Sequence, residues 1–159
     1  MTPFAISLVE ETFAKIEPQS EAFARHFYDD LFATAPEVRP YFEGVDIEAQ
    51  SKKLMETLSL MVKGLNDLET TIPMVEELAK RHVAYGVQPD DYDKVGASLM
   101  RTLARALEED FHQEAEMAWD ETYSTMATVM KMAAYDEDTS SRSFRSTRHA
   151  GQKPFWKFW

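Results

Sequence analysis

One stretch decides the fold, and it reads Glu77-Leu78-Ala79-Lys80-Arg81-His82-Val83-Ala84-Tyr85-Gly86-Val87. Met74, Leu78 and His82 are four residues apart, so in a helix they share one face and the imidazole points inward. Pro73 near the start and Gly86 just past the end predict a short helix. Proline is tolerated at the first helical position, and glycine is favoured just after the last.

The inward histidine is the first candidate functional residue. No second histidine or cysteine is nearby, which makes a zinc site with three or four protein ligands a poor interpretation. A single axial bond to haem iron fits better, because the porphyrin supplies the equatorial ligands. An isolated inward histidine is nevertheless more often an ordinary core residue. The rest of the sequence has to decide between these two interpretations.

The composition predicts one domain. With 159 residues and 44% hydrophobic content, the chain is long enough for one core and too short for two ordinary domains. The absence of cysteine excludes disulfides, iron–sulfur clusters and covalent haem attachment, so any haem is held noncovalently. The start has no signal-peptide character and no apolar run has membrane-spanning length, which predicts a cytoplasmic protein.

The charge divides the chain into two parts. The formal net charge of −11 argues against nucleic-acid binding, because phosphate contacts need a basic surface. All 28 acidic residues lie in residues 1–138, whereas residues 139–159 contain five of the 17 basic residues and no acidic one. We therefore predict a domain over residues 1–138 and a basic C-terminal tail over residues 139–159.

Helical periodicity runs through the predicted domain. Hydrophobic residues recur every three or four positions, with Phe4 and Leu8 on the inward face of the first helix. Prolines and caps delimit the predicted helices, at about residues 3–17, 20–34, 47–66, 73–85, 89–107 and 112–134, with a very short segment after Pro36. No segment alternates with a period of two, so the predicted fold class is all-α.

Six motifs together carry a family resemblance. They are Phe27-Tyr28, Pro36-Glu37-Val38-Arg39-Pro40-Tyr41-Phe42, Gln50 with Leu54, Lys80-Arg81-His82, Asp91-Tyr92-Asp93-Lys94-Val95-Gly96 and Ala118-Trp119-Asp120-Glu121-Thr122-Tyr123. In their order and spacing, over roughly residues 4–134, the chain resembles bacterial single-domain haemoglobins and the globin domain of flavohaemoglobins. The resemblance implies a globin fold of seven to eight helices around a noncovalent b-type haem, with the tail as a C-terminal extension.

The resemblance also implies roles for individual residues. His82 would be the proximal iron ligand, and Phe42 would stack on the haem. Tyr28 and Gln50 would act together on the open side of the iron, because a phenolic O–H is a preorganised donor to a partly negative O2. The pocket would be completed by Leu54, Val87, Val95 and Met126. Lys53 and Arg81 would lie near the edge of the haem and pair with its propionates, or each would be a solvated surface charge.

Two departures from the family pattern bear on function. In the family, a late glutamate joins the histidine and a tyrosine in a hydrogen-bonded triad that strengthens the imidazole as an electron donor. Tyr92 matches the tyrosine, but Ala134 stands at the position of the glutamate, with Asp136 and Glu137 nearby. The sequence also contains no glycine-rich nicotinamide fingerprint, so we expect a separate reductase.

Three functions follow from the resemblance. The first is reversible binding of O2, and of NO and CO, by an oxygen carrier or gas-responsive globin. The second is an enzyme, an NO dioxygenase that depends on an external reductase. The third is a haem-based sensor that signals through the tail.

The tail ends in Pro154-Phe155-Trp156-Lys157-Phe158-Trp159. Alternating cationic and aromatic residues suit an anionic membrane surface, which would make the protein peripheral to the membrane. They suit a partner protein or the acidic body of the same chain equally well. A non-native extension is also compatible with this composition.

Overall fold

The computed structural model describes residues 1–84 and 86–135, and within them it contains helices and no strand. The six α-helices are α1 (Pro3–Ile16), α2 (Ser20–Thr34), α3 (Ile47–Gly64), α4 (Leu68–Ala84), α5 (Pro89–Leu107) and α6 (Gln113–Tyr135). Three short 3₁₀ helices join them: η1 (Glu17–Gln19), η2 (Pro36–Phe42) and η3 (Glu108–Asp110). The all-α prediction is confirmed. The predicted tail, with Asp136 and Glu137, lies outside the described residues.

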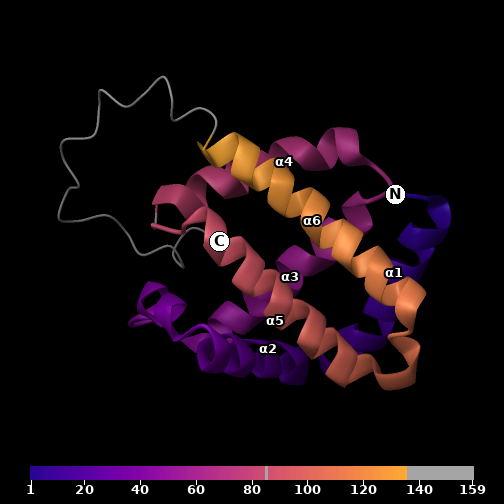
Figure 1. Ribbon diagram of the computed structural model, residues 1–159, viewed down its shortest axis with the longest axis horizontal. Coiled ribbons are helices and arrows are strands. Elements are labelled where there is room, and N and C mark those ends of the chain that lie inside the picture. The colour runs from indigo at the N-terminus through magenta and orange to yellow at the C-terminus, as the bar shows by residue number, and fades with distance from the viewer. Residues whose placement is uncertain (85, 136–159) are drawn as a thin grey trace.

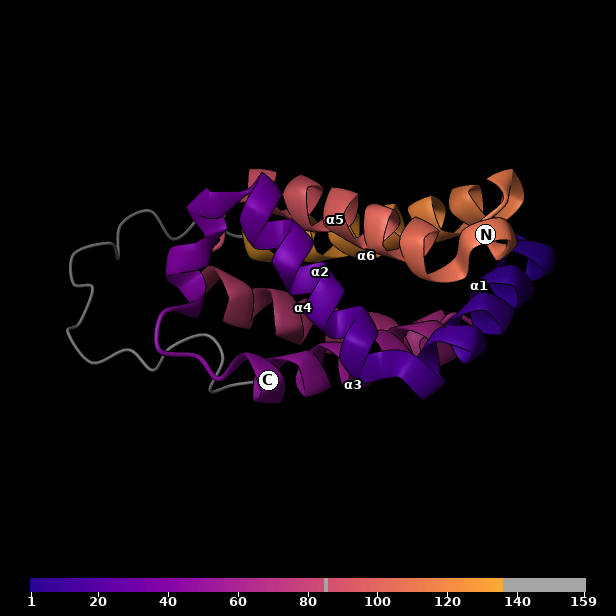
Figure 2. The same cartoon turned by 90° about the horizontal axis from the view of Figure 1, so that it is seen from below.

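The helices form two layers that leave room for a cavity. Figure 2 shows α5 and α6 together in one layer and α3 and α4 in the other, with α2 crossing between the layers. In Figure 1, α6 runs diagonally across the front from α1 to the end of α4. The contacts agree, because α6 packs against α4, α1 and α5, while α2 packs against α3 and α5.

Local chemistry sets several helix ends where the sequence predicted them. The Oγ1 of Thr2 accepts a hydrogen bond from the Ala5 N–H at 3.1 Å, which caps α1. The carboxylate of Asp46 accepts the Glu48 N–H at 3.1 Å and caps α3 in the same way. Pro89 occupies the first position of α5, where its missing N–H costs nothing.

The helix that carries His82 differs from the prediction at its start. α4 begins at Leu68, so Pro73 lies inside the helix rather than at its first position. The prediction that Met74 faces inward was wrong, because Met74 is 54% exposed. The predicted end is confirmed by Gly86, whose φ of +88° is one that glycine adopts readily and whose N–H donates to the Val83 carbonyl at 3.0 Å.

The contact between α1 and α6 centres on Trp119. This side chain is 2% exposed, and its indole N–H donates to Thr12 Oγ1 at 2.8 Å. The inward stripe of α1 consists of Val9, Phe13 and Ile16. The prediction that Phe4 belongs to this stripe was wrong, since Phe4 is 60% exposed. In the described part of the chain, no helix is both long and apolar enough to span a membrane.

Candidate functional site

An apolar cavity lies between the two layers. It is bounded by residues of α2, η2, α3, α4, α5 and α6, together with the loop that follows α4. Most of its wall is aliphatic or aromatic. The side chains with polar atoms on the wall are Tyr28, Tyr41, Thr57, His82, Asp91, Tyr92 and Tyr123. A pocket of this kind favours a largely apolar ligand held by a few directed polar groups.

Tyr28 is the donor on the α2 side of the cavity. It is 3% exposed, and its ring meets Phe27 edge-on at 5.1 Å and Phe42 edge-on at 5.5 Å between centroids. Burial raises the pKa of the Tyr28 phenol well above its usual range, and the nearby Gln50 amide offsets this only in part. The phenol therefore stays protonated and keeps a hydrogen bond to donate.

Gln50 lies beside Tyr28, in the first turn of α3, and is 2% exposed. Its amide is close enough to influence the phenol, yet its Nε2 makes no hydrogen bond of normal geometry to any described residue. A buried amide without a partner is costly, at about 1–3 kcal/mol. The Gln50 amide is therefore a polar group that a ligand would satisfy.

His82 lines the same cavity as Tyr28 and lies on the last turn of α4. Its Nδ1 lies 2.8 Å from the Leu78 carbonyl oxygen, one turn earlier in the helix. In the tautomer that donates from Nδ1, the ring's lone pair is on Nε2. Burial lowers the pKa of His82 despite the opposing effect of this hydrogen bond, so the imidazole is kept neutral. A neutral, oriented imidazole is the form that binds iron.

The described residues offer no group of three or more His, Cys, Asp or Glu side chains that could hold a metal ion directly. A metal at His82 would therefore need most of its ligands from another source. A macrocycle supplies such ligands, as it does in haem proteins with one axial histidine.

Tyr92 lies on the cavity wall near the start of α5. Burial raises the pKa of its phenol well above the usual range, and the hydroxyl has no hydrogen-bond partner among the described residues. The backbone of Tyr92 is held by α6, since the Tyr123 hydroxyl donates to the Tyr92 carbonyl at 2.5 Å. The predicted position of a family glutamate, Ala134, supplies no carboxylate. An incomplete proximal triad remains a prediction.

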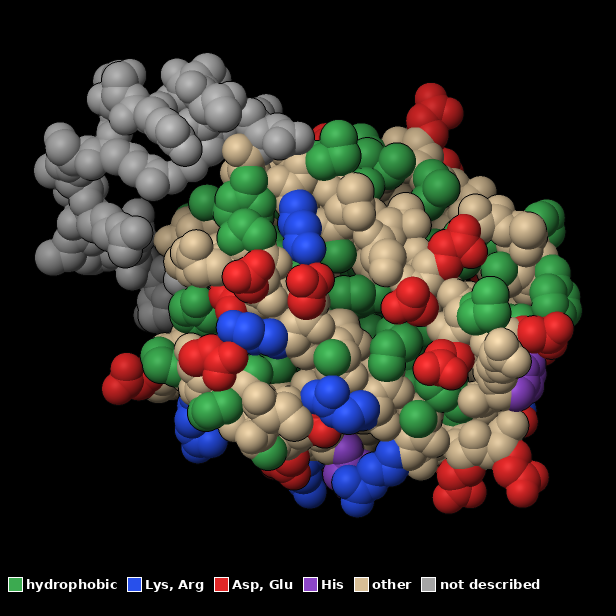
Figure 3. Space-filling model, viewed as in Figure 1, with side chains coloured by type: hydrophobic (Ala, Val, Ile, Leu, Met, Phe, Trp, Pro, Cys, Tyr) green, Lys and Arg blue, Asp and Glu red, His purple; other side chains and the backbone are tan. Residues whose placement is uncertain are grey.

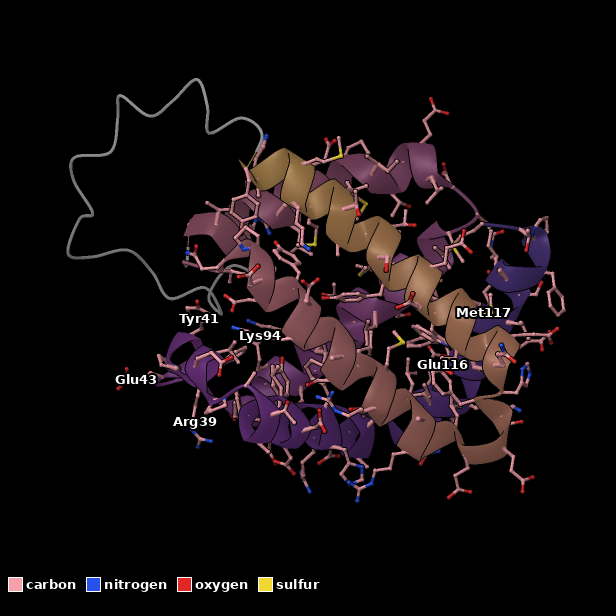
Figure 4. All side chains as sticks on the ribbon, viewed as in Figure 1. Arg39, Tyr41, Glu43, Lys94, Glu116 and Met117 are labelled. Atoms are coloured by element: carbon pink, nitrogen blue, oxygen red, sulfur yellow. The ribbon has the colours of Figure 1, made fainter. Side chains whose placement is uncertain are left out.

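Sequence reasoning missed a cluster at the cavity edge, which we call the Asp91 clasp (Tyr41, Asp91, Lys94 and Glu37). Asp91 is 5% exposed, and its Oδ2 accepts the Tyr41 hydroxyl at 2.9 Å and the Gln88 N–H at 2.8 Å. Lys94 lies 3.2 Å from Asp91 Oδ1 and 3.0 Å from Glu37. Figure 4 shows Tyr41 and Lys94 close together where η2 meets α5. The clasp thus joins two walls of the cavity.

A second residue that the sequence did not single out is Tyr135, at the end of α6. Its hydroxyl donates to the Val87 carbonyl at 2.7 Å, which fixes the loop that follows His82. Burial raises the pKa of Tyr135 to about 12, so this donor is also permanent at neutral pH. No local pattern reveals the contact, because the two residues are 48 positions apart.

The structure brings most of the predicted site residues together. The cavity wall includes eight of them: Tyr28, Phe42, Leu54, His82, Val87, Tyr92, Val95 and Met126. Gln50 is buried next to Tyr28 but is not part of the wall. Lys53 is half-buried and Arg81 is exposed, and both lie off this wall. Their individual roles remain predictions.

The chain is similar to known proteins over most of its length. The family model described as Globin matches residues 25–130. A flavohemoprotein of Vibrio cholerae is 29% identical over 131 residues, which cover 81% of this chain and 33% of that protein. A flavohemoprotein of Burkholderia sp. (strain TH2) is 26% identical over 149 residues, covering 89% of this chain and 38% of that protein. The chain thus spans about a third of the length of the curated relatives it matches.

Proposed function

The chain belongs to the globin family, and on this premise we propose that it is a haem protein that reversibly binds O2 and other diatomic gases. The matched curated relatives are flavohemoproteins, a name that denotes a haem. We further propose haem b, held noncovalently, because the chain contains no cysteine for covalent attachment.

The residues of the cavity fit this cofactor. His82 presents a neutral imidazole that is fixed by the Leu78 carbonyl, and the wall of the same cavity carries Tyr28, next to which lies the unsatisfied amide of Gln50. Between them the wall is apolar, which suits a flat hydrophobic macrocycle. When bound, haem supplies an iron that takes a diatomic gas as an additional ligand.

The observation that carries the proposal is that the buried, permanently protonated phenol of Tyr28 lines the same cavity as the His82 imidazole. Tyr28 donates a hydrogen bond to the partly negative end of a ligand, in a cavity whose wall includes the apolar side chains of Phe27, Phe42 and Leu54. Gln50 keeps an amide N–H available to the Tyr28 oxygen or to the ligand, and thereby supports the orientation of the phenol.

A second function, NO dioxygenation, is favoured by the same pair of donors. The overall reaction combines NO, O2 and one electron into nitrate. Tyr28 and Gln50 stabilise the developing negative charge, which is how a preorganised site accelerates such a step. The 159 residues contain no nicotinamide fingerprint, so the electron comes from a flavin domain or protein outside them. We place binding first, because it needs only the residues on the cavity wall.

One experiment separates the two functions. The haem-loaded protein is supplied in catalytic amount with NADH, an unrelated flavin reductase, O2 and NO, after its Soret band has been recorded. Many NO molecules consumed per haem, with inhibition by CO, would identify a dioxygenase. One turnover followed by a ferric protein would leave gas binding as the function. A protein without a Soret band after haem addition would overturn both.

The matched control is the Tyr28→Phe variant, which keeps the ring and removes the donor. In a dioxygenase this variant loses most of its turnover while retaining the Soret band. A turnover equal to that of the wild type would mean that the Tyr28 hydroxyl does not act on the ligand.

A further inference from the structure

A groove outside the cavity lies between α1 and the part of α6 from Glu114 to Val129. Its residues are Thr2, Phe4, Ala5, Leu8, Glu114, Met117, Ala118, Asp120, Glu121, Ser124, Thr125, Thr128 and Val129. Figure 4 shows Met117 on the side of α6 that faces α1. In Figure 3, acidic and hydrophobic side chains share this part of the surface. The groove combines an apolar floor with an acidic rim.

The floor exposes large apolar side chains. Phe4 is 60% exposed and Met117 is 63% exposed, and both border the same groove. Single exposed hydrophobic residues are normal on protein surfaces. Two large ones in one groove, with Leu8 and Val129 beside them, make a continuous apolar surface that suits aromatic side chains.

The rim is acidic and has no compensating cation among the lining residues. Glu121 pairs with the N-terminal amine at 3.1 Å, and Glu114 lies 4.0 Å from His112. Asp120 has no ion pair within the described part of the chain. Two other surface grooves are less acidic in balance, because one has Arg25 and Lys52 beside four glutamates and the other has one arginine beside one glutamate. This groove therefore selects a cationic occupant.

We propose that this groove binds residues 153–159 of the same chain, Lys-Pro-Phe-Trp-Lys-Phe-Trp. The segment supplies two cations for the rim and four aromatic side chains for the floor, and it contains no acidic residue. Residues 139–152 add Arg142, Arg145 and Arg148, which extend the charge complementarity toward the acidic surface of the domain. The proposal does not depend on the gas ligand or the reaction at the cavity.

The length of the intervening chain allows this contact within one molecule. From Tyr135 back to Ser124, α6 covers about 17 Å at 1.5 Å per residue. The 18 residues from Tyr135 to Lys153 span up to about 60 Å when extended and about 23 Å on average as a flexible chain. The average span is longer than the distance along α6, so the contact needs no stretched chain. Tethering at that length gives an effective concentration in the millimolar range, which favours a weak intramolecular contact.

Docking has a consequence for the other partners considered for the tail. The same aromatic and basic residues would insert into an anionic membrane surface. A segment held in the groove is withheld from that surface until a competitor displaces it. Because exposed ion pairs are screened within about 10 Å at 0.1 M salt, added salt weakens the rim contacts and leaves the apolar floor.

The test follows the indole N–H groups of Trp156 and Trp159 by ¹⁵N relaxation in the ferrous CO-bound protein, which is diamagnetic. Buried Trp119 is the internal reference for the tumbling of the domain. Docking predicts order parameters of about 0.8 for the tail indoles at low salt, whereas a free segment gives values below about 0.6. Dilution should leave the values unchanged, because the contact is intramolecular.

Two matched pairs of variants locate the contact. Met117→Ser removes one large side chain of the apolar floor and should lower the order parameters of the tail indoles. The control is Met132→Ser, at a 58% exposed position of α6 outside the groove, and it should leave them unchanged. The double variant Glu114→Gln/Asp120→Asn should release the tail indoles at about half the salt concentration that the wild type needs. Its control is the double variant Glu69→Gln/Glu76→Gln on α4, which should leave that salt concentration unchanged.

Three results would overturn the proposal. Mobile indoles in the wild-type protein at low salt would exclude docking. Order that increases with protein concentration would assign the groove to the tail of a second copy. Mobile indoles that become ordered only with phosphatidylserine vesicles would assign the tail to a membrane surface instead.

Discussion

Removing the Tyr41 hydroxyl should open the cavity at the Asp91 clasp. Tyr41→Phe keeps the ring and deletes only the donor that reaches Asp91 Oδ2 at 2.9 Å. Asp91 retains the Gln88 N–H and the Lys94 ammonium, so its cap on α5 survives. The η2 segment that carries Phe42 then loses its side-chain hydrogen bond to α5, leaving the Lys94–Glu37 ion pair as the remaining link of the clasp.

The magnitude follows from the bonds involved. A hydrogen bond to a charged acceptor contributes about 1.5–3 kcal/mol, and Tyr41 is half-buried, so we expect a loss of about 1–2 kcal/mol of stability. Asp91→Ala removes the acceptor of all three donors. It adds the loss of a helix cap, about 1 kcal/mol, and of a partly exposed ion pair worth at most about 1 kcal/mol. The total for Asp91→Ala is about 2–4 kcal/mol.

The assays are urea unfolding and the rate of haem transfer to an excess of an apoglobin acceptor. Both variants should lose haem faster than the wild type, by about tenfold for Tyr41→Phe, since 1.4 kcal/mol corresponds to a factor of ten. The control is Asp30→Asn, which breaks an α2–α5 ion pair (2.7 Å to Arg101) that is not on the cavity wall. Equal haem-loss rates for Tyr41→Phe and Asp30→Asn at matched stability would refute the reasoning.

Three further predictions concern the donor, the α2–α5 ion pair and the contact between α5 and α6. Tyr28→Phe should speed O2 dissociation about 10–100-fold in stopped flow, because a hydrogen bond to a charged acceptor is lost; an unchanged rate would mean that the phenol points elsewhere. The hydrogen bond from Arg101 lowers the pKa of Asp30. The stabilisation by this ion pair is therefore present above about pH 4 and is lost as the pH falls through the lowered pKa. The stability difference between the wild type and Asp30→Asn, from urea unfolding, should therefore shrink below pH 3.8, and a constant difference would contradict the ion pair. Gly96→Ala places a methyl group 2.5 Å from the Tyr123 ring, so it should destabilise the protein by about 1–3 kcal/mol in urea unfolding. An unchanged free energy of unfolding would mean that α5 and α6 can move apart without cost.

The sequence predicted what depends on neighbouring residues. Thr2, Asp46 and Pro89 start helices by local chemistry, and hydrophobic periodicity gave the all-α class. The prediction from sequence failed where the spacing of apolar residues does not determine which face of a helix is buried. Met74 and Phe4 fit an apolar stripe by spacing alone, yet the neighbouring helices do not cover them.

The candidate site shows the same division. The residues of the family motifs, among them Tyr28, Phe42 and His82, meet at one cavity. Tyr41 and Asp91 appeared in the sequence only as members of two separate motifs, because their hydrogen bond joins residues 50 positions apart. Such contacts depend on how the layers pack, and no local pattern encodes them.

The proximal side offers the last test, because the family resemblance implies a triad in which Tyr92 and a carboxylate strengthen His82 as an electron donor. This hydroxyl is buried and has no partner among the described residues. Tyr92→Phe should therefore leave the free energy of unfolding unchanged or raise it by up to about 1 kcal/mol, since an unsatisfied buried polar group is removed. The iron–histidine stretching frequency in resonance Raman spectra should also stay constant. A destabilised variant with a lower frequency would mean that a carboxylate, such as that of Asp136 or Glu137, completes a triad with Tyr92. A strengthened imidazole would then favour dioxygenation over simple gas binding, because electron donation through the proximal ligand promotes O–O chemistry.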